Sequence, residues 1–167
     1  MTSLTLYPDV PCAYPNTLGA NITTGVGNTS KILAVFRNDS TVPSLRGVMQ
    51  RFGFNVINQS ADTLVTIQFV GGVTANGGVW TPVGGQSLFD INKTATGITG
   101  GIVALTRYTF ATTAHGNQPP ASVLPAEYAS EMGLELPVGM QFAIVANIST
   151  AGATASIAWS VNWLEKD

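Results

Sequence analysis

The sequence predicts an all-β protein, and three observations lead to that prediction. Only 10% of the 167 residues are charged and 18 are glycine, a composition that favours strands and turns over helices with charged exposed faces. Apolar and polar residues alternate in several short stretches, and no stretch has helical periodicity. Turn-forming residues separate these stretches at short intervals. Together these features predict a single-domain sandwich or barrel of about eight antiparallel strands.

The clearest strand pair lies near the C-terminus. A mostly apolar strand is predicted at positions 140–147 after a Pro-Val-Gly corner, and a small polar turn separates it from a second strand. Every other residue of that second strand is apolar: Ala155, Ile157, Trp159, Val161 and Trp163. Such alternation places one set of side chains on a buried face. Burial of each tryptophan would contribute about 4–6 kcal/mol before conformational entropy is subtracted, so we expect these strands to close the core.

Shorter patterns predict six earlier strands. Their approximate ranges are 31–36, 46–58, 63–70, 79–83, 87–91 and 101–111. We interpret the glycine-rich residues 71–78 and 92–101 as turns, residues 112–126 as a long loop, and residues 127–132 as a short helical turn. The strand at 101–111 is apolar on both faces, which favours either a central place in a sheet or a subunit interface.

Residues 1–30 are interpreted as an extended N-terminal arm that precedes the β-sandwich domain, residues 31–167. The arm is polar, and prolines follow two of its tyrosines, which holds the backbone there in extended geometry. A segment of this kind cannot bury enough surface alone, so we expect it to pack on its own domain, on a neighbouring subunit or on a larger assembly. Its aromatic and aliphatic residues are the candidate attachment sites: Tyr7, Tyr14, Leu18 and Ile22.

Charge and cysteine content exclude several classes of protein. The formal net charge is −2, and the seven basic residues are scattered, which gives no electrostatic footprint for nucleic acid. The single cysteine, Cys12, excludes an intrachain disulfide and a thiol-rich metal site. Residues 1–18 do not resemble a signal peptide, and no apolar stretch is long enough to cross a membrane. We therefore expect neither a nucleic-acid partner nor a membrane partner.

No constellation of residues indicates catalysis. His115 is the only histidine, it lies in a Pro- and Gly-containing loop, and the chain has no Gly-x-Ser-x-Gly motif. Two carboxylate pairs have the residue types of a glycosidase, Asp90 with Glu127 and Glu131 with Glu135, but solvated turns account for both. We predict a protein that is not an enzyme and that has no cofactor and no metal site.

The order of features along the chain resembles a known family. Several features follow a hairpin predicted from residues 46–58 and 63–70. They are a short strand at 87–91, a glycine-rich opening to a long strand at Thr99-Gly100-Gly101, a Leu-Pro-x-Gly corner at 136–139, a closing strand with Trp159 and Trp163, and an acidic tail, Glu165-Lys166-Asp167. This order resembles the small jelly-roll virion proteins of tailed bacteriophages, of the head-decoration or head-fibre type. The resemblance extends from about Lys31 to the C-terminus.

The resemblance implies a jelly roll of two four-stranded sheets, often trimeric, with no catalytic residues. The expected function is that of a structural virion protein, with a capsid decoration protein on the head surface favoured. Such a subunit would be made in the host cytoplasm, form a homotrimer and bind other virion proteins, such as the major capsid protein, through its N-terminal arm. The low charge of the chain agrees with this, because the cores of protein interfaces are depleted of charged residues.

Two alternatives remain at the sequence level. The first is a tail or fibre module that binds a receptor or a host-surface glycan through the loops at 71–78 and 112–126. The second is a hydrolase, which is the least favoured because the chain has one histidine and no acidic cluster.

Overall fold

The computed structural model describes residues 10–11, 21–83, 87–111, 127–128 and 134–166. These residues contain twelve strands and no helix, and eight of the strands are four residues or longer. The strands are β1 (Val10–Pro11), β2 (Asn21–Val26), β3 (Lys31–Asn38), β4 (Arg46–Gln59), β5 (Thr63–Asn76), β6 (Thr81–Pro82), β7 (Phe89–Asn92), β8 (Gly97–Ala111), β9 (Glu127–Tyr128), β10 (Glu135–Pro137), β11 (Gln141–Ile148) and β12 (Ala155–Lys166). The prediction of an all-β protein is confirmed.

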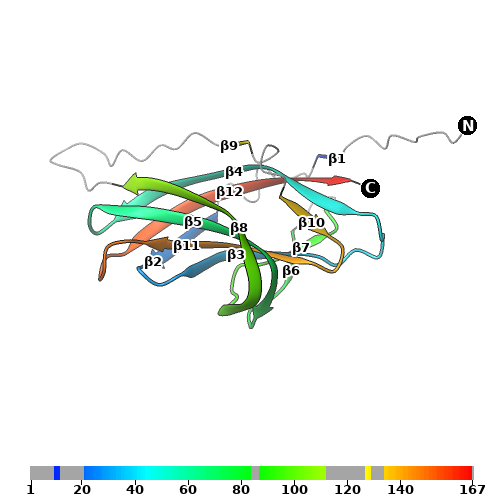
Figure 1. Ribbon diagram of the computed structural model, residues 1–167, viewed down its shortest axis with the longest axis horizontal. Helices are drawn as coiled ribbons and strands as arrows, with labels where there is room; N and C mark the ends of the chain where they lie inside the picture. The colour runs from blue at the N-terminus through cyan, green and yellow to red at the C-terminus, as the bar shows by residue number, and fades with distance from the viewer. Residues whose placement is uncertain (1–9, 12–20, 84–86, 112–126, 129–133, 167) are drawn as a thin grey trace, which may run out of the picture.

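The strands form two antiparallel sheets that pack against each other (Figure 1). Sheet A has the order β1-β12-β4-β10, with β2 also paired to β12 and β9 to β4, and sheet B has the order β6-β7-β3-β11-β5-β8. Consecutive strands from β2 to β5 alternate between the sheets, as do β10, β11 and β12. The chain therefore crosses between the layers repeatedly, and the sandwich-like class expected from the sequence is the one observed.

The alternation predicted for the last strand is confirmed, and it closes the core as expected. All five alternating apolar residues of β12 are buried, and Trp163 is only 1% exposed. Its ring lies 5.5 Å from that of Phe36 and 5.7 Å from that of Phe142, both on strands of sheet B. Because β12 is a central strand of sheet A, these ring contacts join the two sheets at the middle of the sandwich.

The prediction that residues 46–58 and 63–70 form a hairpin is wrong, because these residues belong to β4 and β5, two long strands that lie in different sheets. Their alternating apolar residues are buried as expected: Phe52, Phe54, Val56, Val65, Ile67 and Phe69. The rings of Phe52 and Phe69 meet edge to face at 5.0 Å, so β4 and β5 contact each other across the core rather than through backbone hydrogen bonds.

The glycine-rich residues 71–76 and 97–101 are strands, which corrects their interpretation as turns. β5 continues to Asn76 and β8 begins at Gly97, so the two pair along nearly their whole length. Gly101 has a φ of +92°, and a Cβ at this position would lie 2.5 Å from Cγ1 of Val73. The glycine here allows a bent strand to approach its neighbour closely, and it does not reverse the chain.

β8 occupies the edge of sheet B, not its centre. Ala111 is its only buried residue, although its sequence is as apolar as that of many central strands. Of the two interpretations that the sequence left open for this strand, the structure excludes the central position.

Part of the predicted arm lies in the sandwich. Residues 21–26 form β2, which pairs with β12 so that Ile22 lies opposite Ala158, and β1 pairs with the far end of β12. The sheets therefore begin before the boundary expected at Lys31. The residues of β2 are mostly polar, so they show no alternation to mark a strand. Residues 127–128 pair with β4 as a strand and not as the start of a helical turn.

Candidate assembly surface at the β8 edge

The longest strand of the protein has one free edge. β8 pairs with β5 from Thr63 opposite Ala111 to Asn76 opposite Gly97, and no other strand of the described residues pairs with its second edge. A free edge presents a row of backbone N–H and C=O groups that can bind another strand. Proteins usually protect such an edge with charged side chains, but β8 has a single charged residue, Arg107.

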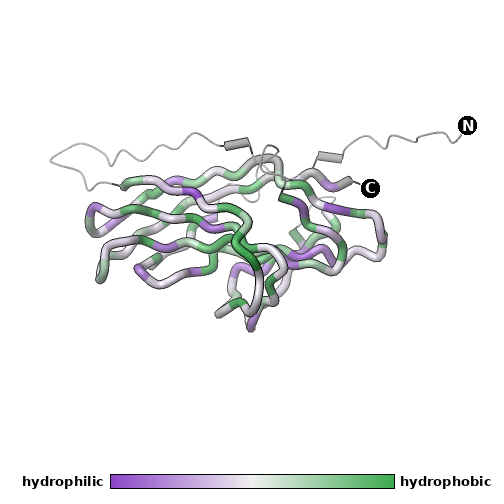
Figure 2. The backbone as a smooth tube through the Cα atoms, in the orientation of Figure 1, coloured by the Kyte–Doolittle hydropathy of each residue, from purple (hydrophilic) through white to green (hydrophobic). Residues whose placement is uncertain are grey.

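Large apolar side chains of β8 face solvent. They are Ile102, Val103, Tyr108 and Phe110, and Ile102 is 80% exposed. Figure 2 shows hydrophobic residues along the bent part of this strand. Single exposed apolar residues are ordinary, but four on one edge strand are typical of a surface that binds another protein.

One end of β8 contributes to an apolar patch on the outer face of sheet B. Phe110 lies directly opposite Leu64 of β5, and Tyr108 follows two residues earlier on the same face. The neighbouring residues Val65 and Ile67 are buried, so Leu64, Tyr108 and Phe110 point away from the core. We call these three exposed residues the outer patch.

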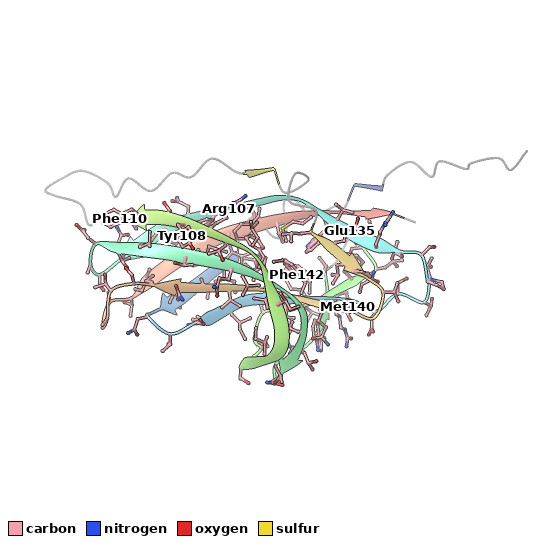
Figure 3. The ribbon with its side chains drawn as sticks, in the orientation of Figure 1. Arg107, Tyr108, Phe110, Glu135, Met140 and Phe142 are labelled. Carbon is pink, nitrogen blue, oxygen red and sulfur yellow. The ribbon has the colours of Figure 1, made fainter. Side chains whose placement is uncertain are left out.

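The other end of β8 borders a cleft of about 590 Å³, which we call the edge cleft. Phe142 and Leu136 line it and are nearly fully buried, so they form its floor. Ile102 and Met140 line it and are exposed, so they form its rim. Figure 3 shows Met140 and Phe142 beside the bend of β8, with Glu135 on β10 and Arg107, Tyr108 and Phe110 further along β8.

The edge cleft follows from topology and from glycine. β10 and β8 end the two sheets on the same side of the sandwich, and they do not pair with each other. Gly71, Gly72 and Gly101 line the cleft without side chains, and a Cβ added to Gly71 would meet nothing within 4 Å. The opening is therefore wide enough to accept apolar side chains from outside. The one acidic residue beside it, Glu135, lies 3.5 Å from the guanidinium of Arg46.

Of the four attachment residues proposed from the sequence, three are outside the described residues and one lies away from the β8 surface. Tyr7, Tyr14 and Leu18 are outside the described residues. Ile22 is 57% exposed on β2, at the edge of sheet A opposite to β10. The structure therefore does not bring Ile22 to the β8 surface. The sequence signal that did point to this surface was the apolar character of both faces of β8.

Of the residues considered for catalysis, the structure describes the side chains of Asp90 and Glu135, and each is paired with an arginine. The carboxylate of Asp90 accepts hydrogen bonds from Nε and Nη2 of Arg37, at 3.0 Å and 2.7 Å, and Glu135 faces Arg46. His115 and Glu131 lie outside the described residues, as does the side chain of Glu127. In the described ranges, no group of three or more His, Cys, Asp and Glu side chains is close enough to hold a metal ion. The same ranges contain no helix that could span a membrane.

Among the described residues, β8 therefore combines an unpaired strand edge with exposed apolar side chains, the features typical of a protein-binding surface. No protein-family model matches the chain, and neither the curated proteins nor the solved structures contain a match.

Proposed function

We propose that this chain is a structural subunit of a bacteriophage particle, a capsid decoration protein of the head surface, which forms a homotrimer through the β8 surface. The observation that carries the proposal is the unpaired apolar edge of β8, with the outer patch at one end and the edge cleft at the other. Structural subunits act by burying surface, and this strand has more exposed large apolar residues than any other edge strand that the structure describes.

The strand order supports a jelly roll. If the short insertion β6-β7 and the two-residue strands are set aside, the sheets read β2-β12-β4-β10 and β3-β11-β5-β8. In this order the chain changes sheet at every step except from β5 to β8, which suits the two Greek keys of a jelly roll with two four-stranded antiparallel sheets. The resemblance noted in the sequence implies the same architecture.

Closed symmetry explains how a subunit could have such an edge and remain soluble. In a closed ring every copy covers the same surface, so no β8 edge stays free to recruit further chains. A trimer in which the outer patch and the edge cleft of adjacent copies meet would hide both features at once. The low charge of β8 suits this arrangement, because Arg107 is the only charged side chain of the strand itself that would need to be desolvated.

The test is the oligomeric state of the double variant Tyr108→Lys/Phe110→Lys, measured by native mass spectrometry and light scattering. We expect the wild-type chain to be a trimer and the variant a folded monomer, because two lysines on the outer patch would have to lose their water to enter the apolar edge cleft of the next copy. The matched control is Val79→Lys, since Val79 is 67% exposed but belongs neither to the outer patch nor to the edge cleft, and this variant should remain a trimer. A wild-type monomer, or trimers of the double variant, would contradict the proposal.

We assign attachment to the shell to the arm, with Tyr7, Tyr14, Leu18 and Ile22 as its contacts and the major capsid protein as its partner. Ile22 is on the opposite edge of sheet A from β10, so it stays accessible when the β8 surface is covered. A deletion of residues 1–20 keeps β2 in the sheet, which a deletion of residues 1–30 would not. The shortened chain should fold and form trimers but not bind undecorated shells in a sedimentation assay, and full binding would refute the assignment.

The alternative, a receptor- or glycan-binding module of the tail or fibre, has less support at the sites first considered for it. Residues 71–76 are part of β5 and not a loop, and residues 112–126 lie outside the described part. Trp80, an aromatic residue that could stack on a sugar, already has the guanidinium of Arg37 4.6 Å from its ring centroid.

A further inference from the structure

A second cleft lies on the outer face of sheet B. It has a volume of about 740 Å³, within the range of small-molecule sites. Residues 93–96, between β7 and β8, form one wall together with the first two residues of β8, and strands β3, β11 and β5 form the floor. The cleft shares no lining residue with the outer patch or the edge cleft, and its ligand does not depend on the function proposed above.

The cleft is positively charged. Lys31 and Lys93 both line it, and none of its described lining residues is acidic. The Nζ of Lys31 donates a hydrogen bond to the carbonyl oxygen of Thr24, and the Nζ of Lys93 donates one to Oδ1 of Asn21 at 2.9 Å. Both acceptors are neutral, and within the described residues neither lysine is paired with a carboxylate. Two uncompensated positive charges therefore border one cavity in a chain whose net charge is −2.

Both ammonium groups are held by hydrogen bonds to one strand. Their acceptors belong to residues 21 and 24 of the same strand, β2. Each lysine has its own acceptor, so the two ammonium groups are separate cationic contacts on one wall of the cleft. A ligand with one anionic group for each lysine would make two charge-assisted hydrogen bonds.

The floor of the cleft is apolar, although its rim is polar. Val70 and Val145 are nearly buried at the base, and Ile32 and Ile98 pack beside them as part of a second hydrophobic cluster. A ligand with C–H surface gains from this floor, whereas a free inorganic anion gains nothing. The ligand is therefore an organic molecule with an apolar face as well as repeated negative charge.

Neutral hydrogen-bonding groups complete the site. The carboxamide of Gln68 and the hydroxyl of Ser30 line the cleft, and the described residues include no partner for either side chain. The hydroxyl of Thr23 accepts a hydrogen bond from Nε1 of Trp159 at 3.1 Å, which leaves its own proton free to donate. Hydroxyl and amide groups above an aliphatic floor match the alternating O–H and C–H surfaces of a sugar ring.

From these features we propose that the cleft between residues 93–98 and the outer face of sheet B binds an acidic polysaccharide segment. Its anionic groups contact Lys31 and Lys93, its hydroxyls contact Gln68 and Ser30, and the C–H faces of its rings lie on the valine and isoleucine floor. The site recognises repeated charge along a sugar chain rather than a single terminal anion.

Isothermal titration calorimetry of the full chain at low salt tests this, with a short oligogalacturonate as the probe. A neutral maltooligosaccharide of equal length, inorganic phosphate and a polyglutamate peptide of equal charge are the comparison ligands. We expect the oligogalacturonate to bind, with affinity that falls as salt is added, and the neutral sugar and phosphate to give no measurable heat. Absence of oligogalacturonate binding, or equal binding of the neutral sugar, overturns the proposal. Equal or tighter binding of polyglutamate also overturns it and reassigns the cleft to acidic peptides.

Substitutions of the two lysines test whether the ligand binds in this cleft. Lys31→Gln and Lys93→Gln should each weaken the oligogalacturonate roughly tenfold, since each removes one charge-assisted hydrogen bond. The matched control is Arg46→Gln, which removes one positive charge on β4, outside the cleft, and should leave the affinity unchanged. Thermal melting of each variant checks that the fold is intact. If the Lys31→Gln/Lys93→Gln double variant is folded and binds as tightly as the wild type, the site is elsewhere.

Discussion

β12 and β8 have similarly apolar sequences, but the structure places them in opposite environments. Both are long strands rich in apolar residues, at alternating positions in β12 and on both faces in β8. β12 lies inside sheet A and buries all five of its alternating residues, including Trp159 and Trp163. β8 lies at the edge of sheet B and buries only Ala111. The comparison shows that the place of a strand in its sheet decides whether its apolar residues are buried in the core or exposed to solvent.

The largest effect should come from the buried strand. Trp163→Ala removes the ring that contacts Phe36, Phe89 and Phe142, and we expect a loss of about 3–5 kcal/mol of unfolding free energy. Urea denaturation in the monomeric Tyr108→Lys/Phe110→Lys background measures this loss without a contribution from association.

Trp163→Phe is the control for that measurement. The indole N–H of Trp163 is buried, and the described residues offer it no hydrogen-bond partner. Phenylalanine keeps an aromatic ring and removes this unsatisfied donor, so it should cost clearly less than alanine. Equal costs for the two substitutions would mean that the ring contacts are not what joins the sheets.

An intermediate effect is expected where β8 bends. Gly101→Ala places a Cβ 2.5 Å from Val73 and 2.8 Å from Val70 in a backbone conformation that disfavours side chains, and should cost about 1–3 kcal/mol. Gly152→Ala is the matched control, because Gly152 also has a positive φ but a Cβ there meets nothing within 4 Å. Differential scanning fluorimetry compares the two, and a smaller loss at Gly101 than at Gly152 would show that the close approach of β5 and β8 is not required.

The smallest effect on stability should come from the exposed end of β8. Phe110→Ala alters a side chain in solvent, so we expect a change within about 0.5 kcal/mol in the monomeric Tyr108→Lys background. In the otherwise wild-type chain, the same substitution should shift trimers toward monomers on dilution, as measured by analytical ultracentrifugation. A large loss of stability in the monomer would place Phe110 in the core and remove the contrast between the two strands.

The sequence predicted those strands in which apolar and polar residues alternate. β4, β5 and β12 were predicted because their apolar residues alternate and are buried. β2 was missed because its residues, Asn-Ile-Thr-Thr-Gly-Val, are mostly polar and are held by pairing with β12. The far part of β5 was missed because Gly71 and Gly72 are typical of a turn, whereas here they lie in a bent strand.

The candidate sites were harder to predict, because they depend on residues far apart in the chain. The apolar character of β8 was visible, but its edge position depends on which strand pairs with it, and that is a property of the whole sheet. Lys31 and Lys93 are distant in sequence and meet at one cleft only because both reach β2. Nothing in the local pattern around either lysine distinguishes it from a solvated surface residue.

The position of the last two strands has a consequence for synthesis of the chain. β11 lies between β3 and β5 in sheet B, and β12 lies between β2 and β4 in sheet A, so the central strand of each layer is made last. While the ribosome is still translating residues 141–166, the earlier strands lack the neighbours that complete their hydrogen bonding. Neither sheet can therefore be completed until residues 141–166 have been made, and the earlier apolar strands keep incomplete pairing until then.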